Sequence, residues 1–387
     1  MEISMPQLMS DKDVIKRVLG HISAKTTDMG DEVWREPVES YQSDEIFAQE
    51  MELFKRLPMV FCPSAALAEN GDYVARTLAG VPLIAVRGND GIVRAFHNSC
   101  RHRGMMLAEG SGKAAGFICP YHAWAYGLDG TLKNVAGRDG FPELDVQSHG
   151  LLAVHAEERS GLLFVTQKEP ISAGAMDALP DLIEPGQEVF EYSSFTDDAN
   201  WKLLLETSME GYHIKTLHHT SFYPYGFDNL NVVETYGANS RIVFPFKRIE
   251  KLRQIPEDKW RADGMLTYVN QLFPNTRLAT LSSHYLLVIL EPITPSQSRW
   301  VIYRLRPPSQ DNSPVDLEKS VRDAAFVKDN GVVEDRAAAC SIQAGMAGSS
   351  NSHFTFGRFE KAIVHFHQRL KLHLDALGAG DNTATRD

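Results

Sequence analysis

Two short clusters of cysteine and histidine constrain the fold of this chain more than any other feature. Cys100-Arg-His102 and Cys119-Pro-Tyr-His122 are separated by sixteen residues, and each cluster offers one thiolate and one imidazole. The two segments must fold together if these side chains bind one inorganic centre. Zinc accepts two Cys and two His, but the common zinc finger places both Cys before both His. The alternating order instead favours a [2Fe–2S] cluster in which two Cys bind one iron and two His bind the other.

These segments resemble the cluster-binding motif of the Rieske non-haem iron (ring-hydroxylating) oxygenases. The resemblance lies in Cys100-Arg-His102-Arg-Gly104 and Cys119-Pro-Tyr-His122-Ala-Trp124. It implies that Cys100, His102, Cys119 and His122 bind a Rieske [2Fe–2S] cluster. It also implies that the chain is the alpha, or terminal oxygenase, component. A structural zinc site is the alternative interpretation.

Composition excludes several classes of protein. Lys and Arg total 39 against 50 Asp and Glu, which gives a formal net charge of −11 and disfavours a nucleic-acid partner. Cys62 and Cys340 are expected to be buried hydrophobic residues and not a disulfide, which fits a reducing compartment. Since no apolar run has the length of a signal peptide or a membrane span, we expect a cytoplasmic protein with no membrane partner.

The pattern of apolar and turn-forming residues changes twice along the 387 residues of the chain. These changes predict an α+β fold with two main domains. Residues 1–57 are expected to form an N-terminal helical arm, because Ile15, Val18, Leu19 and Ile22 recur at helical spacing. Residues 58–170 have short β-branched runs and turn signals, typical of a small antiparallel β domain, here the Rieske domain. Residues 168–187 are expected to form a linker. Residues 188–378 are expected to form the catalytic domain.

The catalytic domain is expected to contain a hairpin and a long C-terminal helix. Tyr285–Leu290 and Trp300–Leu305 have the composition of paired strands. The amphipathic stripe of the helix consists of Phe359, Ile363, Phe366, Leu370, Leu374 and Leu377. The resemblance implies a helix-grip fold, an antiparallel sheet with this helix packed on it. Three histidines of the helix are expected on its solvated face: His365, His367 and His373.

A second constellation begins at Asn200-Trp201-Lys202 and continues through Glu210-Gly-Tyr-His213 to His218, in what is expected to be one helix and its exit. Two His and one carboxylate can bind non-haem Fe(II) and leave positions open for O2 and substrate. On a regular helix His213 and His218 would point about 140° apart, so the helix must end or distort between them. His219 is the rival for the second ligand. The segment resembles the family's iron-binding signature, which implies His213 and His218 as ligands.

The third iron ligand is expected far along the chain. Glu334-Asp335, followed by Gln343-Ala-Gly345, resembles the family's late Glu-Asp segment and implies that Asp335 is the ligand. Glu334 is the fallback. A carboxylate in the first turn of a helix is also favourable for the helix dipole, so a plain capping role is the competing interpretation.

The resemblance gives Glu210 a catalytic role between subunits. It implies that Glu210 links His122 of one subunit to His213 of the next, because a carboxylate can accept the second N–H of both rings. The bridge implies a homotrimer or a multiple of it. Many relatives have Asp in place of Glu210 and Asn in place of Thr207.

Taken together, the resemblance implies a mono- or dioxygenase that activates O2 at a mononuclear Fe(II). It would hydroxylate, dihydroxylate or oxidatively dealkylate a small organic substrate, for example in aromatic hydrocarbon catabolism. Because the chain has no flavin or nicotinamide fingerprint, electrons must come from NAD(P)H through a separate reductase, with or without a ferredoxin. A Rieske electron-transfer or redox-sensing protein is the alternative, and a zinc-stabilised binding protein is the third hypothesis.

The substrate is not encoded in these motifs. An aromatic cluster of Phe222, Tyr223, Tyr225 and Phe227 is expected either to line a substrate cavity or to belong to an ordinary core. An apolar cavity would favour ring hydroxylation, a buried Arg or Lys an acidic aromatic compound, and an aromatic cage a quaternary amine.

Overall fold

The computed structural model describes residues 8–168, 171, 176, 179–307, 314–327 and 332–384. The chain divides into a larger unit and a smaller unit, each built around an antiparallel sheet. The larger unit comprises Met1–Glu50, Asp177–Pro180 and Val189–Asp387, and the smaller one Met51–Met176 and Asp181–Glu188. Residues 169–170, 172–175 and 177–178 of the expected linker lie outside the described residues. The expected domain limits stay predictions.

The smaller unit contains a seven-stranded sheet in the order β2-β11-β10-β5-β4-β3-β6 and a three-stranded sheet in the order β7-β8-β9, within the residues described. The strands are β2 (Met59–Pro63), β3 (Asp72–Leu78), β4 (Val81–Arg87), β5 (Val93–His97), β6 (Gly110–Lys113), β7 (Phe117–Ile118), β8 (Ala125–Tyr126), β9 (Leu132–Asn134), β10 (Ala153–Arg159) and β11 (Leu162–Thr166). Ala79-Gly80 and Ser160-Gly161 close two hairpins with positive φ at both residues. Such two-residue turns match the right-handed twist of the strands and fix their register.

The larger unit contains a seven-stranded sheet in the order β12-β18-β17-β16-β15-β14-β13, again within the described residues. The strands are β12 (Glu188–Asp197), β13 (Val232–Tyr236), β14 (Asn239–Pro245), β15 (Leu266–Leu272), β16 (Thr276–Thr280), β17 (Tyr285–Thr294) and β18 (Gln297–Arg306). Neighbours from β13 to β18 are antiparallel. The expected hairpin is therefore confirmed, with Tyr285 opposite Leu305. A separate ribbon pairs β1 (Trp34–Pro37) with β19 (His353–Phe356).

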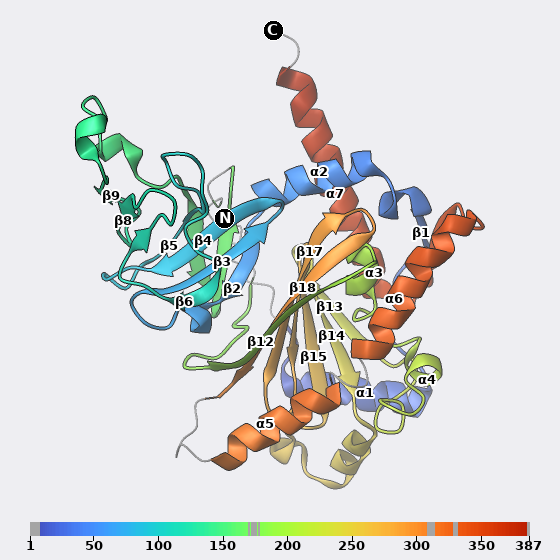
Figure 1. The fold of residues 1–387 in the computed structure, drawn as a ribbon. Helices are drawn as coiled ribbons and strands as arrows, with labels where there is room; N and C mark the ends of the chain where they lie inside the picture. Colours follow the sequence, from blue (N-terminus) through green and yellow to red (C-terminus); the bar gives the residue numbers. More distant parts are fainter. Residues whose placement is uncertain are drawn as a thin grey trace, which may run out of the picture. The chain divides into compact units, whose positions relative to one another are not determined.

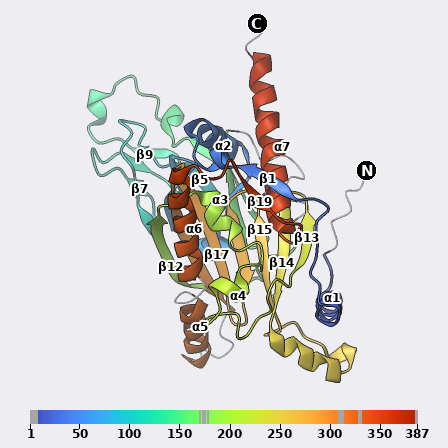
Figure 2. The ribbon, with the colours of Figure 1, turned by 90° about the vertical axis from the view of Figure 1, so that its right-hand side faces the viewer.

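Helices cover parts of the larger sheet (Figures 1 and 2). The helices are α1 (Asp11–Ala24), α2 (Asp44–Arg56), α3 (Trp201–Glu206), α4 (Ile214–Leu217), α5 (Pro314–Val327), α6 (Val333–Gly345) and α7 (Lys361–Ala384). Helix α3 contacts β17 and α6, and α7 contacts β13 and β14. Among the helices of the described residues, none is both long and apolar enough to cross a membrane.

The N-terminal arm begins with the expected amphipathic helix. Ile15, Val18 and Leu19 of α1 are buried against Val232 and Val243 of the larger sheet. Ser10 caps the helix, because its hydroxyl accepts the amide of Asp13. The apolar stripe predicted from the sequence is confirmed, and it packs on the unit that contains the iron-ligand candidates.

One expectation for the C-terminal helix is wrong. His367 is not on a solvated face but is 2% exposed. Its Nε2 lies 2.8 Å from Oε1 of Glu206 and 3.2 Å from the hydroxyl of Tyr41. These polar partners, one from α3 and one from the N-terminal arm, make burial of the ring favourable. His365 and His373 are partly buried, and burial lowers the pKa of both.

Candidate metal centres and active-site cavity

Two loops with the same backbone hydrogen bond carry the first set of ligand candidates. Cys100 follows β5 and Cys119 follows β7. In each loop the cysteine carbonyl accepts the amide of the residue four positions later, Gly104 at 2.8 Å and Ala123 at 2.9 Å. Both of these residues have positive φ, 77° and 57°. Ala123 thus adopts a conformation that glycine takes with less strain.

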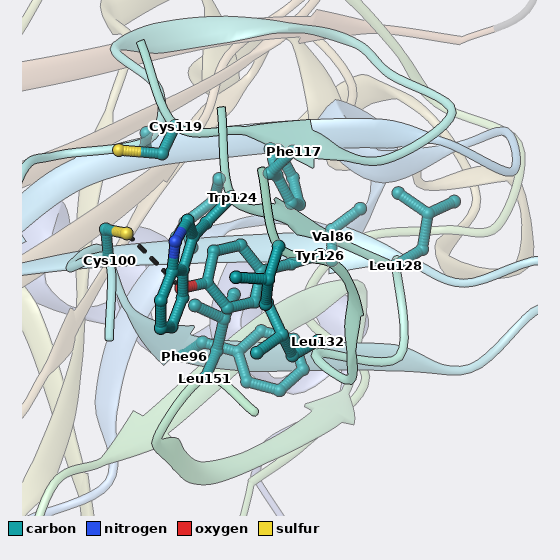
Figure 3. Close-up of a cluster of buried hydrophobic side chains, with 13 residues drawn as sticks. Val86, Phe96, Cys100, Phe117, Cys119, Trp124, Tyr126, Leu128, Leu132 and Leu151 are labelled. Carbon is teal, nitrogen blue, oxygen red and sulfur yellow. Dashed lines mark hydrogen bonds between the residues drawn. The ribbon is translucent and has the colours of Figure 1, made fainter. Parts of the chain in front are cut away.

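The two thiols lie in the core of the smaller unit. Cys100 and Cys119 are each 3% exposed and belong to a hydrophobic cluster with Trp124 and Tyr126. Figure 3 shows both sulfur atoms at the same edge of this cluster. The Tyr126 hydroxyl lies 3.3 Å from Sγ of Cys100 and accepts the amide of Arg101 at 2.9 Å. Tyr126 thereby holds the first loop in place.

The two imidazoles of these loops face each other. Nδ1 of His102 lies 3.1 Å from Nδ1 of His122, and the His102 ring stacks on Trp124 with 5.0 Å between centroids. One metal ion can therefore be bound by both nitrogens. Two buried thiols and two facing imidazole nitrogens fit the mixed ligand set of a Rieske cluster.

The second set of candidates converges at one point in the larger unit. Nε2 of His213 and Nε2 of His218 are 3.2 Å apart, and Oδ1 of Asp335 lies 3.5 Å and 3.0 Å from them, respectively. One ligand atom from each residue lies within 4.8 Å of the others. Two imidazole nitrogens and one carboxylate oxygen fit a facial Fe(II) site.

The segment that carries the two histidines is not one helix and its exit, and that expectation is wrong. Helix α3 ends at Glu206, because the hydroxyls of Thr207 and Ser208 donate back to carbonyls of the preceding turn at 3.0 and 2.8 Å. His213 and His218 flank the four-residue helix α4. The expected interruption between the two ligands is confirmed. His219 is exposed and lies outside the group.

Helix α6 supplies both late carboxylates. Asp335 is the one that contacts Nε2 of both histidines, whereas Glu334 Oε2 lies 2.6 Å from Nδ1 of His218 and accepts the Ser221 hydroxyl at 2.6 Å. Burial raises the pKa of Asp335, but hydrogen bonds with His213 and His218 outweigh burial and lower it. Glu334 and Asp335 both lie in the first turn of α6, where a carboxylate is also favourable for the helix dipole. The contacts of both carboxylates with His218 are an additional feature that a plain capping role does not require.

Glu210 supports His213 from within the same chain. Its Oε1 contacts Nδ1 of His213, and its Oε2 accepts the amide of His213 at 3.3 Å. Burial lowers the pKa of His213, but hydrogen bonds with Asp335 and Glu210 outweigh burial and raise it to about 10. The part of the expected link that involves His122 concerns a neighbouring subunit and stays a prediction.

His213, His218 and Asp335 line a cavity of about 930 Å³. Its wall is largely apolar and contains five aromatic side chains: Phe222, Tyr225, Phe227, Phe244 and Phe246. Three of the four aromatic residues singled out in the sequence are among them, and Tyr223 is not. Thr207 also lines the cavity, but its hydroxyl is bound to the carbonyl of Leu204.

Sequence reasoning missed two polar side chains in the cavity wall. Arg277 is 6% exposed and His284 is 3% exposed. Nε2 of His284 has no hydrogen-bond partner among the described residues. Burial first, and then the charge of Arg304, lower the pKa of His284 to about 4. The available signal for Arg277 was a charged residue inside a short strand, Thr276–Thr280, whose other residues are uncharged.

Two segments of the chain match known protein families. Residues 58–146 match the Rieske [2Fe-2S] domain, and residues 188–376 match the ring hydroxylating alpha subunit (catalytic domain). The chain belongs to the Rieske ring-hydroxylating oxygenases. The family is a class of oxygenases, and its Rieske cluster and mononuclear iron are the cofactors expected from the sequence.

Several curated Rieske oxygenases are similar in sequence. The glycine betaine monooxygenase oxygenase subunit of Chromohalobacter salexigens is 35% identical over 190 residues, 47% of this chain and 42% of the relative. The carnitine monooxygenase oxygenase subunit of Escherichia coli is 35% identical over 198 residues, which are 48% of this chain and 53% of the relative. In these alignments the chain spans about half the length of the curated relatives it matches. Choline monooxygenase of Spinacia oleracea is 25% identical over 349 residues, which are 86% of this chain and 76% of the relative.

Solved structures share the fold. A quaternary ammonium Rieske monooxygenase bound to an inhibitor has a TM-score of 0.76 at 20% identity, with 96% of this chain and 99% of that chain covered. Naphthalene 1,2-dioxygenase with bound indole has a TM-score of 0.72 at 20% identity, with 88% and 92% covered. The α+β fold class is confirmed. The expectation of aromatic hydrocarbon catabolism has no support from the curated relatives named above.

Proposed function

We propose that this chain is a terminal oxygenase component that takes electrons from a separate reductase and inserts oxygen from O2 into a small organic substrate. The observation that carries the proposal is the convergence of His213, His218 and Asp335 beside the cavity. Three protein ligands leave coordination positions open, which oxygenase chemistry requires and a structural metal site does not.

The two centres divide the chemistry. When bound, the Rieske cluster would supply electrons one at a time, and the iron would provide the position at which O2 is reduced. Hydroxylation of one C–H bond consumes one O2, two electrons and two protons, and it releases one water. Cys100, Cys119, His102 and His122 would hold the cluster, and His213, His218 and Asp335 would hold the iron.

The acidic residues around the iron position fix the orientation of its ligands. Glu210 and Glu334 each accept a hydrogen bond from Nδ1 of one histidine, so the proton of each ring stays at Nδ1 and Nε2 stays free to bind metal. Asp335, whose Oδ1 lies 3.0 Å from Nε2 of His218, would be the third protein ligand. The two supporting carboxylates also increase the basicity of the imidazole ligands.

We propose monooxygenation of a polar amine as the reaction. The relatives named as glycine betaine, carnitine and choline monooxygenases support this substrate class. Aromatic side chains in the cavity wall can bind a cationic nitrogen through their ring faces. Hydroxylation of an N-methyl carbon gives an N-hydroxymethyl group. Its C–N bond then breaks, so that the carbon leaves as formaldehyde with loss of the hydroxyl proton and the nitrogen keeps the electron pair as the demethylated amine.

The partners follow from the electron requirement. Since the sequence carries no nucleotide-binding fingerprint, an NAD(P)H-dependent reductase is required, with or without a ferredoxin. We further propose a homotrimer, or a multiple of it, in which Glu210 joins His213 to His122 of the neighbouring subunit. The contact of Glu210 with Nδ1 of His213 supports the half of this bridge that lies within one chain.

The substitution His213→Ala tests the oxygenase proposal. The variant should keep the visible absorption of the cluster but lose the mononuclear iron and the O2 consumption that depends on glycine betaine, carnitine or choline. His219→Ala is the matched control, because His219 is exposed and outside the ligand group. Iron content and substrate-dependent O2 consumption that match the unsubstituted enzyme in His213→Ala would favour an electron-transfer or redox-sensing protein.

A further inference from the structure

Arg277 is placed on the cavity side of the central sheet. It lies in β16, opposite Gln271 of β15 and Val288 of β17. Arg277 and Ala279 both line the cavity, and side chains two positions apart on a strand share a face. The side chain of Arg277 is only 6% exposed. Its guanidinium group is therefore enclosed in the protein at the wall of the proposed active site.

Arg277 and a second arginine, Arg336, lie at the two ends of a row of aromatic side chains. Arg336 has a carboxylate partner. Arg336 of α6 lies over the ring of Phe195 at 4.1 Å, and Phe195 stacks on Trp300 with 5.8 Å between centroids. Asp197 binds Arg336 through two hydrogen bonds of 2.6 Å each. The charge of Arg336 is thus neutralised within the protein.

Arg277 occupies the other end of this row without such a partner. Its guanidinium carbon lies 5.4 Å from the centroid of Trp300. Within the part of the chain that the structure describes, Arg277 has no hydrogen bond and no ion pair. Asp197 is not available to it, because the same carboxylate also accepts Nε1 of Trp300 at 2.8 Å.

A charge that acts on Arg277 belongs to the proposed iron site. Burial lowers the pKa of Arg277 and the charge of Asp335 raises it, so the two groups are close enough to interact. They do not form an ion pair, because Asp335 is directed at Nε2 of His213 and His218. Arginine stays charged in proteins, and a buried charge without a partner is unfavourable. An anionic ligand in the cavity would supply the missing partner.

We infer that Arg277 binds a carboxylate of the substrate, which places the substrates of this enzyme among small organic carboxylates. A carboxylate matches the planar fork of a guanidinium with two parallel hydrogen bonds. Ala279 and Leu286 beside Arg277 provide an apolar wall for the rest of the molecule. The inference rests on the proposed function for the reaction, but the binding site itself does not depend on turnover.

Equilibrium binding to the anaerobic holoenzyme tests this site with probes that differ in charge. Isothermal titration calorimetry compares glycine betaine with choline and benzoate with benzamide, so that each pair contrasts a carboxylate with a neutral group. We expect at least one carboxylate to bind about 30-fold more tightly than its neutral counterpart. In Arg277→Gln this ratio should fall to near one, and Arg277→Lys should retain part of it.

Arg248→Gln is the matched control, because Arg248 is exposed at the cavity rim and the substitution removes the same charge. This control should keep the carboxylate preference. The inference is wrong if the unsubstituted enzyme prefers neither carboxylate, or if Arg277→Gln keeps the preference while its cluster absorption shows a folded protein.

Different results would contradict the proposed oxygenase function and the carboxylate site at Arg277. His213→Ala should lose iron and still prefer the carboxylate probe, since Arg277 is intact. A carboxylate preference that depends on Arg277, together with O2 consumption that does not depend on iron, would contradict only the proposed function. Iron-dependent O2 consumption without a carboxylate preference would contradict only this inference.

Discussion

Glu334 and Asp335 are neighbours on α6, yet they contact opposite nitrogens of one imidazole. Glu334 Oε2 lies 2.6 Å from Nδ1 of His218, and Asp335 Oδ1 lies 3.0 Å from Nε2 of the same ring. The two carboxylates therefore cannot exchange roles without a change in the helix. One is placed beside the proposed iron, and the other fixes the orientation of a proposed ligand.

This division predicts different iron affinities for two conservative substitutions. Asp335→Asn removes a charged ligand and should leave the purified protein with little mononuclear iron. Glu334→Gln should keep the iron but bind it about 10- to 100-fold more weakly, because only the support of His218 is altered. Iron per chain, measured after dialysis against a series of chelator concentrations, checks both. A greater loss of iron in Glu334→Gln than in Asp335→Asn would reverse the assignment.

Glu210→Gln should separate metal binding from electron transfer. Glu210 supports Nδ1 of His213 but does not belong to the converging ligand atoms. Both metal centres should remain, and turnover should fall about 10- to 100-fold because the proposed link between His213 and His122 of the neighbouring subunit is weakened. Iron and acid-labile sulfide content, together with the single-turnover rate, test this expectation. The exposed Glu318→Gln is the control, and unchanged turnover in Glu210→Gln would mean that electrons take another route.

The parts of the site that the sequence predicted are those with local signals. The pairs Cys100 with His102 and Cys119 with His122 are each separated by one or two residues, so their loops could be recognised from spacing alone. The break between His213 and His218 followed from helical geometry, and the α1 stripe followed from periodicity.

The parts that the sequence did not predict depend on partners far away in the chain. His367 was expected on a solvated helix face, but it is buried because Glu206, 161 residues away, binds its Nε2. Lys202 is fully buried because Glu50, 152 residues away, neutralises it. Arg277 has no ion-pair partner among the residues that the structure describes, and this likewise depends on which carboxylates are already engaged. No single-sequence pattern contains that information.

The buried pair of Lys202 and Glu50 predicts a large loss of stability on truncation. Both side chains are 1% exposed, and Glu50 also accepts Nε1 of Trp201 at 2.8 Å. Lys202→Met leaves the Glu50 carboxylate buried without its counter-charge, so it should destabilise the protein by about 3–5 kcal/mol. Thermal unfolding at a fixed scan rate measures the change.

The exposed pair of Lys371 and Asp375 is the matched control for this substitution. Both of its side chains are 63% exposed. Lys371→Met should change stability by less than about 1 kcal/mol, because exposed ion pairs contribute little. Equal shifts in the unfolding temperature for the two variants would contradict the special role of burial. The double variant Lys202→Met with Glu50→Gln should recover part of the loss.

His365 predicts a pH dependence of stability on the acid side. Burial first, and then the charge of Arg369, lower the pKa of His365 from 6.5 to about 4. Between pH 6.5 and pH 4 the unfolded chain therefore binds more protons at this residue than the folded chain does, so its contribution to stability is lost as the pH falls. His365→Gln should give a flatter plot of unfolding temperature against pH in this window. Some slope should remain, since the pKa of His284 is also lowered to about 4 by burial.

His219→Gln removes an exposed histidine and should leave the slope unchanged, and an equally steep plot for His365→Gln would show that this ring is not kept neutral by the fold.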